Sequence, residues 1–197
     1  MLIGLTGGIA CGKSTVAQLL TDRGAAVVDA DRVAREVVAP GSAGLAALAQ
    51  AFGAEVLDPR GHLDRARLAT LVFGDAAARR RLEAITHPLI AQESMRQLAA
   101  AAATGAPLVV YDAALLFESG RAEHFRPVLV VSARPEVQRA RLMARDGLTA
   151  AEADARINAQ MPVADKAARA DHVIENSGDR AQTAAQVAAL WAQWVHP

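Results

Sequence analysis

A glycine-rich segment near the start of the chain constrains the fold more than any other feature. Residues Gly7–Ser14 read GGIACGKS and match the pattern G-x-x-x-x-G-K-[ST]. The strand-like run Leu2–Thr6 precedes the segment and a helical pattern follows it, which is the order that this motif requires. Such a loop curls its amide groups around an anion at the positive end of the helix dipole. The sequence therefore predicts a phosphate-binding loop, in which Lys13 bridges the terminal phosphates and the Ser14 hydroxyl binds Mg²⁺.

Two other interpretations of the segment fit less well. A glycine-rich turn that only starts a helix has no need of lysine and serine at the last two positions. A dinucleotide-binding loop requires G-x-G-x-x-G and an acidic residue about 20 positions later, and the glycine spacing differs here. We therefore expect ATP to be bound by Gly8, Ile9, Ala10, Cys11, Gly12, Lys13, Ser14 and Thr15.

The charge balance favours small ligands over nucleic acid. The 21 basic and 21 acidic residues cancel, so local positive charge must meet any anionic ligand. The basic run Arg79–Arg81 can form a local patch, although on a helix such a run is more often a solvated face. We expect no nucleic-acid partner.

Length and composition favour a soluble chain with one core. The 197 residues, 52% of them apolar, suit a single domain over 1–197 with an insertion. The longest apolar runs, such as Val128–Val131, are too short to span a bilayer. The chain opens on strand-like MLIGLT, and its single cysteine, Cys11, cannot form an internal disulfide. We expect a cytoplasmic protein without a membrane partner, as a monomer or small homo-oligomer.

Short apolar runs alternate with helical patterns along the chain. This alternation predicts an α/β fold whose parallel strands are covered by helices on both faces. The expected strands are Leu2–Thr6, Ala26–Val28, Pro107–Tyr111, Pro127–Ser132 and His172–Glu175. The expected helices between and after them include Lys13–Arg23, Ser42–Phe52, Arg134–Arg145 and Asp179–Trp194.

The stretch before the third strand is too long for an ordinary crossover. It contains helical patterns at Asp64–Phe73 and Asp75–Ala103, the second interrupted by His87-Pro88. We interpret residues 60–105 as a helical insertion that holds the second substrate.

Two aspartates follow the second strand, where the carboxyl ends of parallel strands form a ligand crevice. Transfer of a phosphoryl group to an alcohol benefits from a carboxylate that orients the hydroxyl and accepts its proton. Either Asp29 or Asp31 could serve, and Asp31 is our choice. The alternative is that Asp31 caps a helix over Arg32–Val38.

Asp112 ends the apolar run before it, in the position of an aspartate that supports Mg²⁺ in many phosphate-loop proteins. Glu118, six residues later, is a weaker candidate for the same role. A strand-ending aspartate in a turn is the alternative for Asp112.

Two arginines could close over the nucleotide. Arg141 and Arg145 share a helix face, and a bound triphosphate would relieve their repulsion. The alternative is a solvated face with Glu136 and Asp146 as partners. The polar segment Gly147–Gln160 could move as a hinged lid, so we expect a lid over 140–162.

Separated segments together resemble one family, dephospho-CoA kinase, within the P-loop nucleoside-triphosphate hydrolase superfamily. They occur in the family's order and span nearly the whole chain. The segments are LTGGIACGKSTVA (5–17), VVDADRVAREVV (27–38), HPLI (87–90), LLFESG (115–120), RLMARDGLTAAEADARINAQMP (141–162) and ADHVIENSG (170–178).

This resemblance implies a fold and an activity. The implied fold is three-layered, with a five-stranded parallel sheet, a helical acceptor subdomain and a lid. The implied reaction transfers the terminal phosphate of ATP, with Mg²⁺, to the ribose 3′-hydroxyl of dephospho-CoA, the last step of coenzyme A synthesis.

The same resemblance implies roles for single residues. Asp31 matches the base, with Lys13 and Arg141 as further catalytic residues. The nucleotide side would also include Arg145 and, beside the adenine, the segment Asn176–Gly178. The acceptor side would comprise Asp31, Arg35, His87, Leu115 and Glu118. His87 has an equally weighted alternative, which is to break its helix together with Pro88.

The chain departs from the family pattern at three positions. Ala10 and Cys11 replace glycine and serine in the loop, and alanine is tolerable there only if its φ need not be positive. The helix N-terminus is expected to lower the pKa of the Cys11 thiol, so that a thiol reagent inactivates and ATP protects. Ala114 stands where the family often has proline, which implies a looser turn.

Two other nucleotide-dependent functions remain for comparison. A GTPase would need the guanine-reading tetrad Asn-Lys-x-Asp, which does not occur in the sequence. A kinase for another small alcohol, such as a nucleoside or nucleotide, is the closer alternative, and only the family-specific segments argue against it.

Overall fold

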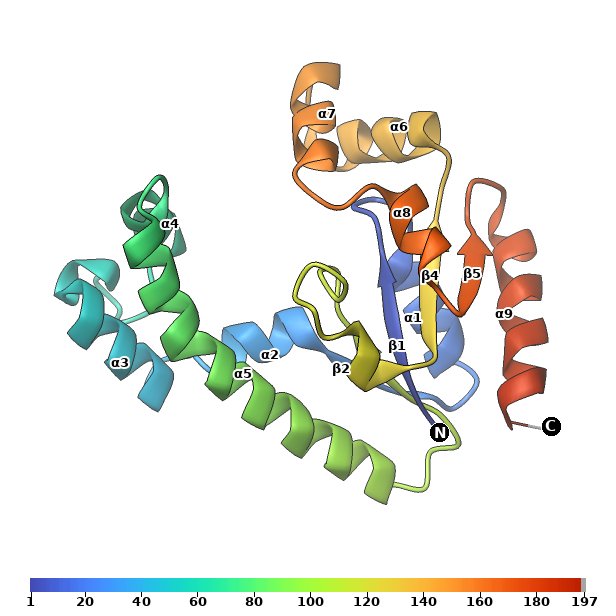
Figure 1. The fold of residues 1–197 in the computed structure, drawn as a ribbon, viewed down its shortest axis with the longest axis horizontal. Helices are drawn as coiled ribbons and strands as arrows, with labels where there is room; N and C mark the ends of the chain where they lie inside the picture. The colour runs from blue at the N-terminus through green and yellow to red at the C-terminus, as the bar shows by residue number, and fades with distance from the viewer. Residues whose placement is uncertain (196–197) are drawn as a thin grey trace. The chain divides into compact units, whose positions relative to one another are not determined.

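The computed structural model describes residues 1–195 and separates into two compact units (Figure 1). Residues 1–29 and the chain from Ala100 onward form the first, which we call the sheet unit. Residues Ala30–Ala99 form the second, which we call the helical unit. No helix within residues 1–195 is long and apolar enough to cross a membrane.

The sheet unit contains one five-stranded, all-parallel sheet, as expected. Its strand order is β2-β3-β1-β4-β5. The carboxyl ends of parallel strands meet at one edge, so the loop after the central β1 begins between the ends of β3 and β4. The strands are β1 (Leu2–Gly7), β2 (Ala26–Asp29), β3 (Val109–Asp112), β4 (Val128–Ser132) and β5 (His172–Glu175).

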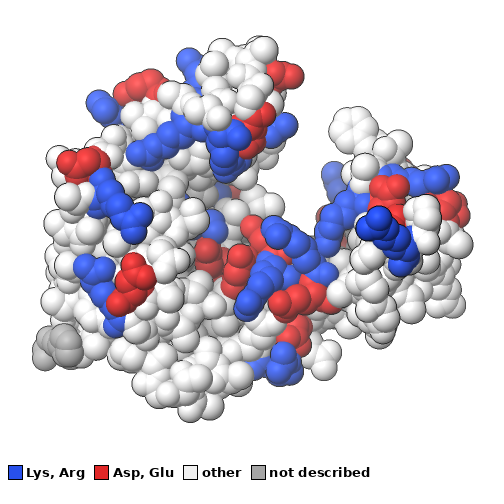
Figure 2. All heavy atoms as spheres, turned by 180° about the vertical axis from the view of Figure 1, so that it is seen from behind, with Lys and Arg blue, Asp and Glu red and all other residues white. Residues whose placement is uncertain are grey.

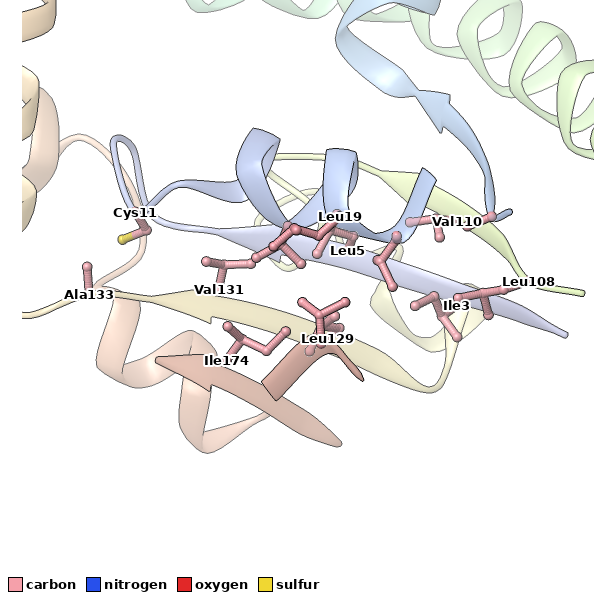
Figure 3. Packing of buried hydrophobic residues seen from close by; sticks show 14 residues of the cluster. Ile3, Leu5, Cys11, Leu19, Leu108, Val110, Leu129, Val131, Ala133 and Ile174 are labelled. Atoms are coloured by element: carbon pink, nitrogen blue, oxygen red, sulfur yellow. The ribbon is translucent and has the colours of Figure 1, made fainter. Parts of the chain in front are cut away.

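One face of the sheet packs against α1 (Lys13–Thr21) and α9 (Arg180–Val195), which contact each other (Figure 1). Ile3 and Leu5 of β1 and Leu19 of α1 belong to the same buried cluster (Figure 3). Burying a side chain of this size stabilises the fold by about 1.5–3 kcal/mol. The core of the unit therefore lies directly behind the loop that joins β1 to α1.

The opposite face of β1 requires a glycine. A Cβ at Gly4 would lie 2.8 Å from Leu116 Cδ2 and 3.0 Å from the Phe125 carbonyl oxygen. The chain after β3, including the short 3₁₀ helix η2 (Ala122–Phe125), thus packs closely against the strand backbone.

Three helices lie between β4 and β5 in the sheet unit. They are α6 (Pro135–Asp146), α7 (Ala150–Asn158) and α8 (Val163–Ala168). Gly147 ends α6 with φ 67°, a conformation that glycine adopts without strain. Thr149 and Glu152 form a reciprocal capping box that starts α7.

The helical unit has its own small core, formed by Val38, Leu48, Val56 and Leu68. Ser42 accepts a hydrogen bond from the Leu45 amide (3.1 Å) and so caps one of its helices. The helices are α2 (Ala30–Glu36), α3 (Ala43–Phe52), the 3₁₀ helix η1 (Ala54–Val56), α4 (Arg65–Val72) and α5 (Ala76–Ala103), whose end passes into the sheet unit.

The predicted interruption at His87-Pro88 is wrong. Helix α5 continues through Pro88, although proline lacks an amide donor and commonly costs a helix interior about 3 kcal/mol. Residues before and after it are anchored by packing, since Leu82 and Ile85 pack against the core of the unit and Leu98 is buried. Tertiary packing on both sides of Pro88 outweighs the local preference to end the helix.

Candidate active site

The loop between β1 and α1 has the backbone of a tight anion cradle. Gly12, at the N-cap of α1, has φ 88°, which strongly favours glycine. The Cys11 amide donates to the Gly8 carbonyl oxygen (3.1 Å), and the Thr15 amide donates to that of Gly12 (3.0 Å). The loop therefore closes on itself before α1 begins at Lys13.

From the sequence, alanine is expected to be tolerated at position 10 only if its φ need not be positive, and the structure does not meet this condition. Its φ is 59°, in the left-handed region, and no other non-glycine residue described has a positive φ. An L-residue with a Cβ pays about 1–2 kcal/mol for this conformation. The geometry of the loop, rather than the preference of the residue, thus determines the backbone here.

The expected lowering of the Cys11 thiol pKa is also wrong. Cys11 is fully buried at one end of the core cluster, beside Ala133 (Figure 3). Burial raises the pKa of the thiol, and hydrogen bonds from the Gly8 and Ala133 amides offset this only in part. Desolvation of the thiolate thus outweighs these hydrogen bonds together with the positive charges of Arg141 and Lys166.

Lys13 forms an ion pair with Asp112 beside the loop. Asp112 is the last residue of β3 and is buried. It is also in register with Leu5 on one side and Asp29 on the other. The strands thus bring the motif lysine to one of the two carboxylates that end β2 and β3.

A cavity of about 270 Å³ lies beside the start of α1. Arg141 donates from Nη1 to the Asn176 carbonyl oxygen (2.7 Å), which holds both residues at its wall. The lining residues are Gly12, Thr15, Arg141, Asn176, Gly178 and Arg180. Five of these were expected to bind the nucleotide or to lie beside its adenine, whereas Arg180 was missed because nothing in its local pattern marks it.

The buried Asn176 side chain supports the loop. Its Nδ2 donates to the Cys11 carbonyl oxygen (2.7 Å), and its Oδ1 accepts from Thr183 Oγ1 (2.6 Å). Asn176 therefore braces the loop from behind as well as lining the cavity.

Arg145 lies apart from this cavity in an exposed ion-pair cluster. It donates to Asp146 from Nε (2.7 Å), and Arg156 donates to the same carboxylate (2.8 Å). Hydrogen bonding to Asp146 raises the pKa of Arg145. Figure 2 shows basic side chains gathered on the lobe of α6 and α7 with acidic ones among them.

Two glutamines that the sequence reasoning missed bind the tip of the loop. Gln138 of α6 donates from Nε2 to the Ile9 carbonyl oxygen (2.7 Å). Gln160 accepts from the Ile9 amide through Oε1 (3.0 Å). Both contacts join residues more than 125 positions apart, so no local signal in the sequence could have revealed them.

The residues expected on the acceptor side fall in both units. Asp31 and Arg35 are exposed on α2, and His87 is exposed on α5, all within the helical unit. Asp31 lies in the first turn of α2, which begins at Ala30, and not at its N-cap. Within the sheet unit, Leu115 is half exposed, while Glu118 pairs with Lys166.

The parallel sheet, the phosphate loop after its central strand and the lysine at the start of α1 define a P-loop nucleotide-binding protein. Within that class, the chain belongs to the dephospho-CoA kinase family, whose model matches residues 1–182.

Curated relatives agree with this family. The dephospho-CoA kinase of Anaeromyxobacter dehalogenans is 58% identical over 177 residues, covering 90% of this chain and 84% of the relative. That of Syntrophotalea carbinolica is 52% identical over 195 residues, covering 99% and 92%.

Solved structures share the fold. A crystal structure from Thermus thermophilus has a TM-score of 0.83 at 38% identity, covering 98% of this chain and 97% of that one. Dephospho-CoA kinase from Campylobacter jejuni has a TM-score of 0.68 at 24% identity, covering 99% and 97%. The second likeness concerns the fold alone.

Proposed function

We propose that the protein transfers the terminal phosphate of ATP to the ribose 3′-hydroxyl of dephospho-CoA, giving coenzyme A and ADP. The family match over residues 1–182 carries this proposal. The geometry is compatible with it, because the loop, the Lys13–Asp112 pair and the cavity lined by Arg141 lie in one unit. We place the enzyme in the cytoplasm, with ATP and dephospho-CoA as its small-molecule substrates.

On the nucleotide side, the loop and the first turn of α1 would bind the phosphates. Backbone amides at a helix N-terminus favour anionic oxygens. The Lys13 ammonium, held beside the loop by Asp112, would bridge the terminal phosphates, and Arg141 would stabilise charge on the transferring group. The neighbouring cavity, bordered by Asn176, would take the rest of the nucleotide.

The oxygen donors beside the loop suit Mg²⁺, which proteins often hold through one or two side chains together with substrate phosphates. Ser14 offers an exposed hydroxyl in the first turn of α1. Asp112 offers a carboxylate in register with that of Asp29. When bound, Mg²⁺ would neutralise charge on the phosphate oxygens.

On the acceptor side, we propose that Asp31 orients the ribose hydroxyl and accepts its proton. Its support is its place two residues after the end of β2 and the match of VVDADRVAREVV to the family. Residues 60–105 would help to bind the acceptor, with contacts from Arg35, His87, Leu115 and Glu118. The segment 140–162 would act as the lid over the nucleotide.

A product assay tests the function. The purified protein is incubated with magnesium-ATP and, separately, with dephospho-CoA, adenosine and common nucleotides, and each product is identified by mass. We expect dephospho-CoA to gain one phosphate and to be the preferred acceptor. Transfer to another alcohol while dephospho-CoA stays unmodified would replace this function with that of a different small-molecule kinase.

A further inference from the structure

The chain uses lysine at only two of its 21 basic positions, Lys13 and Lys166. The first belongs to the phosphate-loop motif. The second, in α8, is fully buried and lies at the other side of the same loop. Burying an ammonium group destabilises a fold by several kcal/mol unless the group is paired and hydrogen-bonded. The groups that bind the Lys166 ammonium therefore indicate its role.

Three oxygen acceptors surround the Lys166 ammonium. Nζ forms an ion pair with Glu118 Oε1 at 2.8 Å and donates to the Ala114 carbonyl oxygen at 2.9 Å. A longer contact of 3.4 Å reaches the carbonyl oxygen of Gly7, the first residue of the phosphate-loop motif. The three acceptors match the three N–H donors of a lysine.

These acceptors belong to two segments that flank the site. Gly7 ends β1, whereas Ala114 and Glu118 lie in the chain just after Asp112 and β3. Thr6 Oγ1 also donates to the Ala114 carbonyl oxygen (3.1 Å), so the turn at this alanine is held from two sides. Lys166 thus joins the base of the phosphate loop to the chain that follows the Asp112 carboxylate.

The segment that carries Lys166 makes a second set of contacts with the same two regions. The Met161 amide donates to Glu118 Oε1 (3.1 Å), the oxygen that also pairs with Lys166. Gln160, the preceding residue, binds the Ile9 amide. Residues 160–166, which lie between the end of α7 and the middle of α8, are therefore tied both to the loop and to the chain after β3.

We propose that Lys166 is a positioning residue for phosphoryl transfer, which holds the phosphate loop and the segment 113–118 in one relative placement. This inference rests on the proposed function, because it assigns the two segments to the donor and acceptor sides of the reaction. Lys166 is not proposed to contact the reacting atoms. It acts through Gly7, Ala114 and Glu118.

The shape of the site explains why a lysine suits it. An ammonium is a compact charge whose donors can reach acceptors in three directions, whereas a guanidinium is a planar fork that suits paired oxygens in its own plane. The acceptors here come from three separate residues of two segments. We therefore expect Lys166→Arg to restore charge but only part of the positioning.

Replacing Lys166 by methionine keeps the length of the side chain and removes its charge. We expect Lys166→Met to lower kcat at least tenfold while the Kd for ATP, measured by calorimetry, changes less than threefold. The kcat of Lys166→Arg should be at least threefold higher than that of Lys166→Met. Turnover is expressed per ATP-binding site, so that a smaller folded fraction does not count as slower transfer.

Arg126→Met is the matched control. Arg126 pairs with Asp171 (2.7 Å) in the same unit but next to the amino end of β4, opposite the loop. We expect it to lower the unfolding temperature without changing kcat more than twofold. If Lys166→Met behaves like this control, with kcat per site within twofold of the wild type, the proposal is overturned.

Glu118→Gln tests the same link from its partly exposed end, and it remains informative if Lys166→Met does not fold. We expect a three- to tenfold loss of kcat. Where the double variant Lys166→Met/Glu118→Gln folds, its kcat should be no lower than that of Lys166→Met alone, because the two side chains act as one unit. Fully additive losses of kcat would contradict the link. If the wild type phosphorylates a different acceptor, the proposed function fails. The kcat values of the wild type and the Lys166 variants are then compared with that acceptor, and this comparison still decides the positioning role.

Discussion

At the scale of single residues, the phosphate loop holds one alanine in a backbone conformation that L-residues disfavour. Ala10 holds φ 59° where glycine would be unstrained. We expect Ala10→Gly to raise the free energy of unfolding by about 0.5–1 kcal/mol, because relief of about 1–2 kcal/mol of strain exceeds the extra entropy of glycine in the unfolded chain. Urea unfolding at neutral pH measures the change.

Gly147→Ala is the reverse control for Ala10→Gly. Gly147 has φ 67° at the end of α6, so a Cβ there should destabilise by about 1 kcal/mol. If Ala10→Gly also destabilises the protein, the contacts of the Ala10 methyl group outweigh the backbone strain.

The burial of Cys11 changes the expected thiol chemistry. Because the thiol is buried and its pKa is raised, we expect labelling by a thiol reagent at pH 8 to be at least a hundredfold slower in the native protein than in denaturant. Mass spectrometry over time gives both rates. Comparable rates would mean that the loop opens readily and exposes the thiol.

The role proposed for Asp31 predicts a specific kinetic defect. Asp31→Asn keeps the size of the side chain but removes the base, so we expect kcat to fall by about 10²–10⁴ while ATP binding is largely kept. Calorimetry for ATP and a product assay separate the two effects. Asp29→Asn, two positions earlier, is the comparison. Unchanged turnover in Asp31→Asn would show that Asp31 is not the base.

At the scale of elements, α5 contains a proline that its local sequence does not favour. Pro88→Ala would supply an amide donor in the helix interior, and we expect the unfolding free energy to rise by about 1–3 kcal/mol. Pro135 provides the control, because it sits in the first turn of α6, where proline is well tolerated. We expect Pro135→Ala to change stability by less than about 0.5 kcal/mol.

A lower stability of Pro88→Ala would show that packing of the proline ring outweighs the missing hydrogen bond. Thermal unfolding followed by circular dichroism distinguishes these outcomes. Activity measured in parallel would show whether the HPLI segment also contributes to acceptor binding.

At the scale of the whole molecule, paired carboxylates predict sensitivity to acid. Hydrogen bonds from Arg96 and then Gln97 lower the pKa of Glu93 from 4.5 to about 2, and the Val128 amide lowers the pKa of Asp171. A folded-state pKa below the unfolded value means that the unfolded chain binds more protons in acid. The stabilisation is therefore present above about pH 4.5 and is lost as the pH falls toward 2.

Urea unfolding at pH 7, 5, 4 and 3 measures this dependence. Glu93→Gln should make the decline between pH 4.5 and pH 3 shallower, because it removes one of the groups responsible. A stability that stays constant down to pH 3 would contradict the prediction.

The sequence alone determined the parts of this protein that depend on adjacent residues. The motif Gly7–Ser14, the five strands and most helices were predictable, because a strand, a tight turn and a helix start each follow from neighbouring residues. The order of family-specific segments predicted the family for the same reason, since each segment is contiguous.

Only the tertiary structure decided how the loop is held and which local preferences are overridden. Gln138, Gln160 and Lys166 reach the loop from more than 125 residues away, and their contacts exist only once the sheet has brought those segments together. The same packing forces Ala10 to a positive φ, buries the Cys11 thiol and carries α5 through Pro88. For Ala10 and Pro88, the free energy of long-range packing exceeds a local preference of about 1–3 kcal/mol, which a sequence pattern by itself does not reveal.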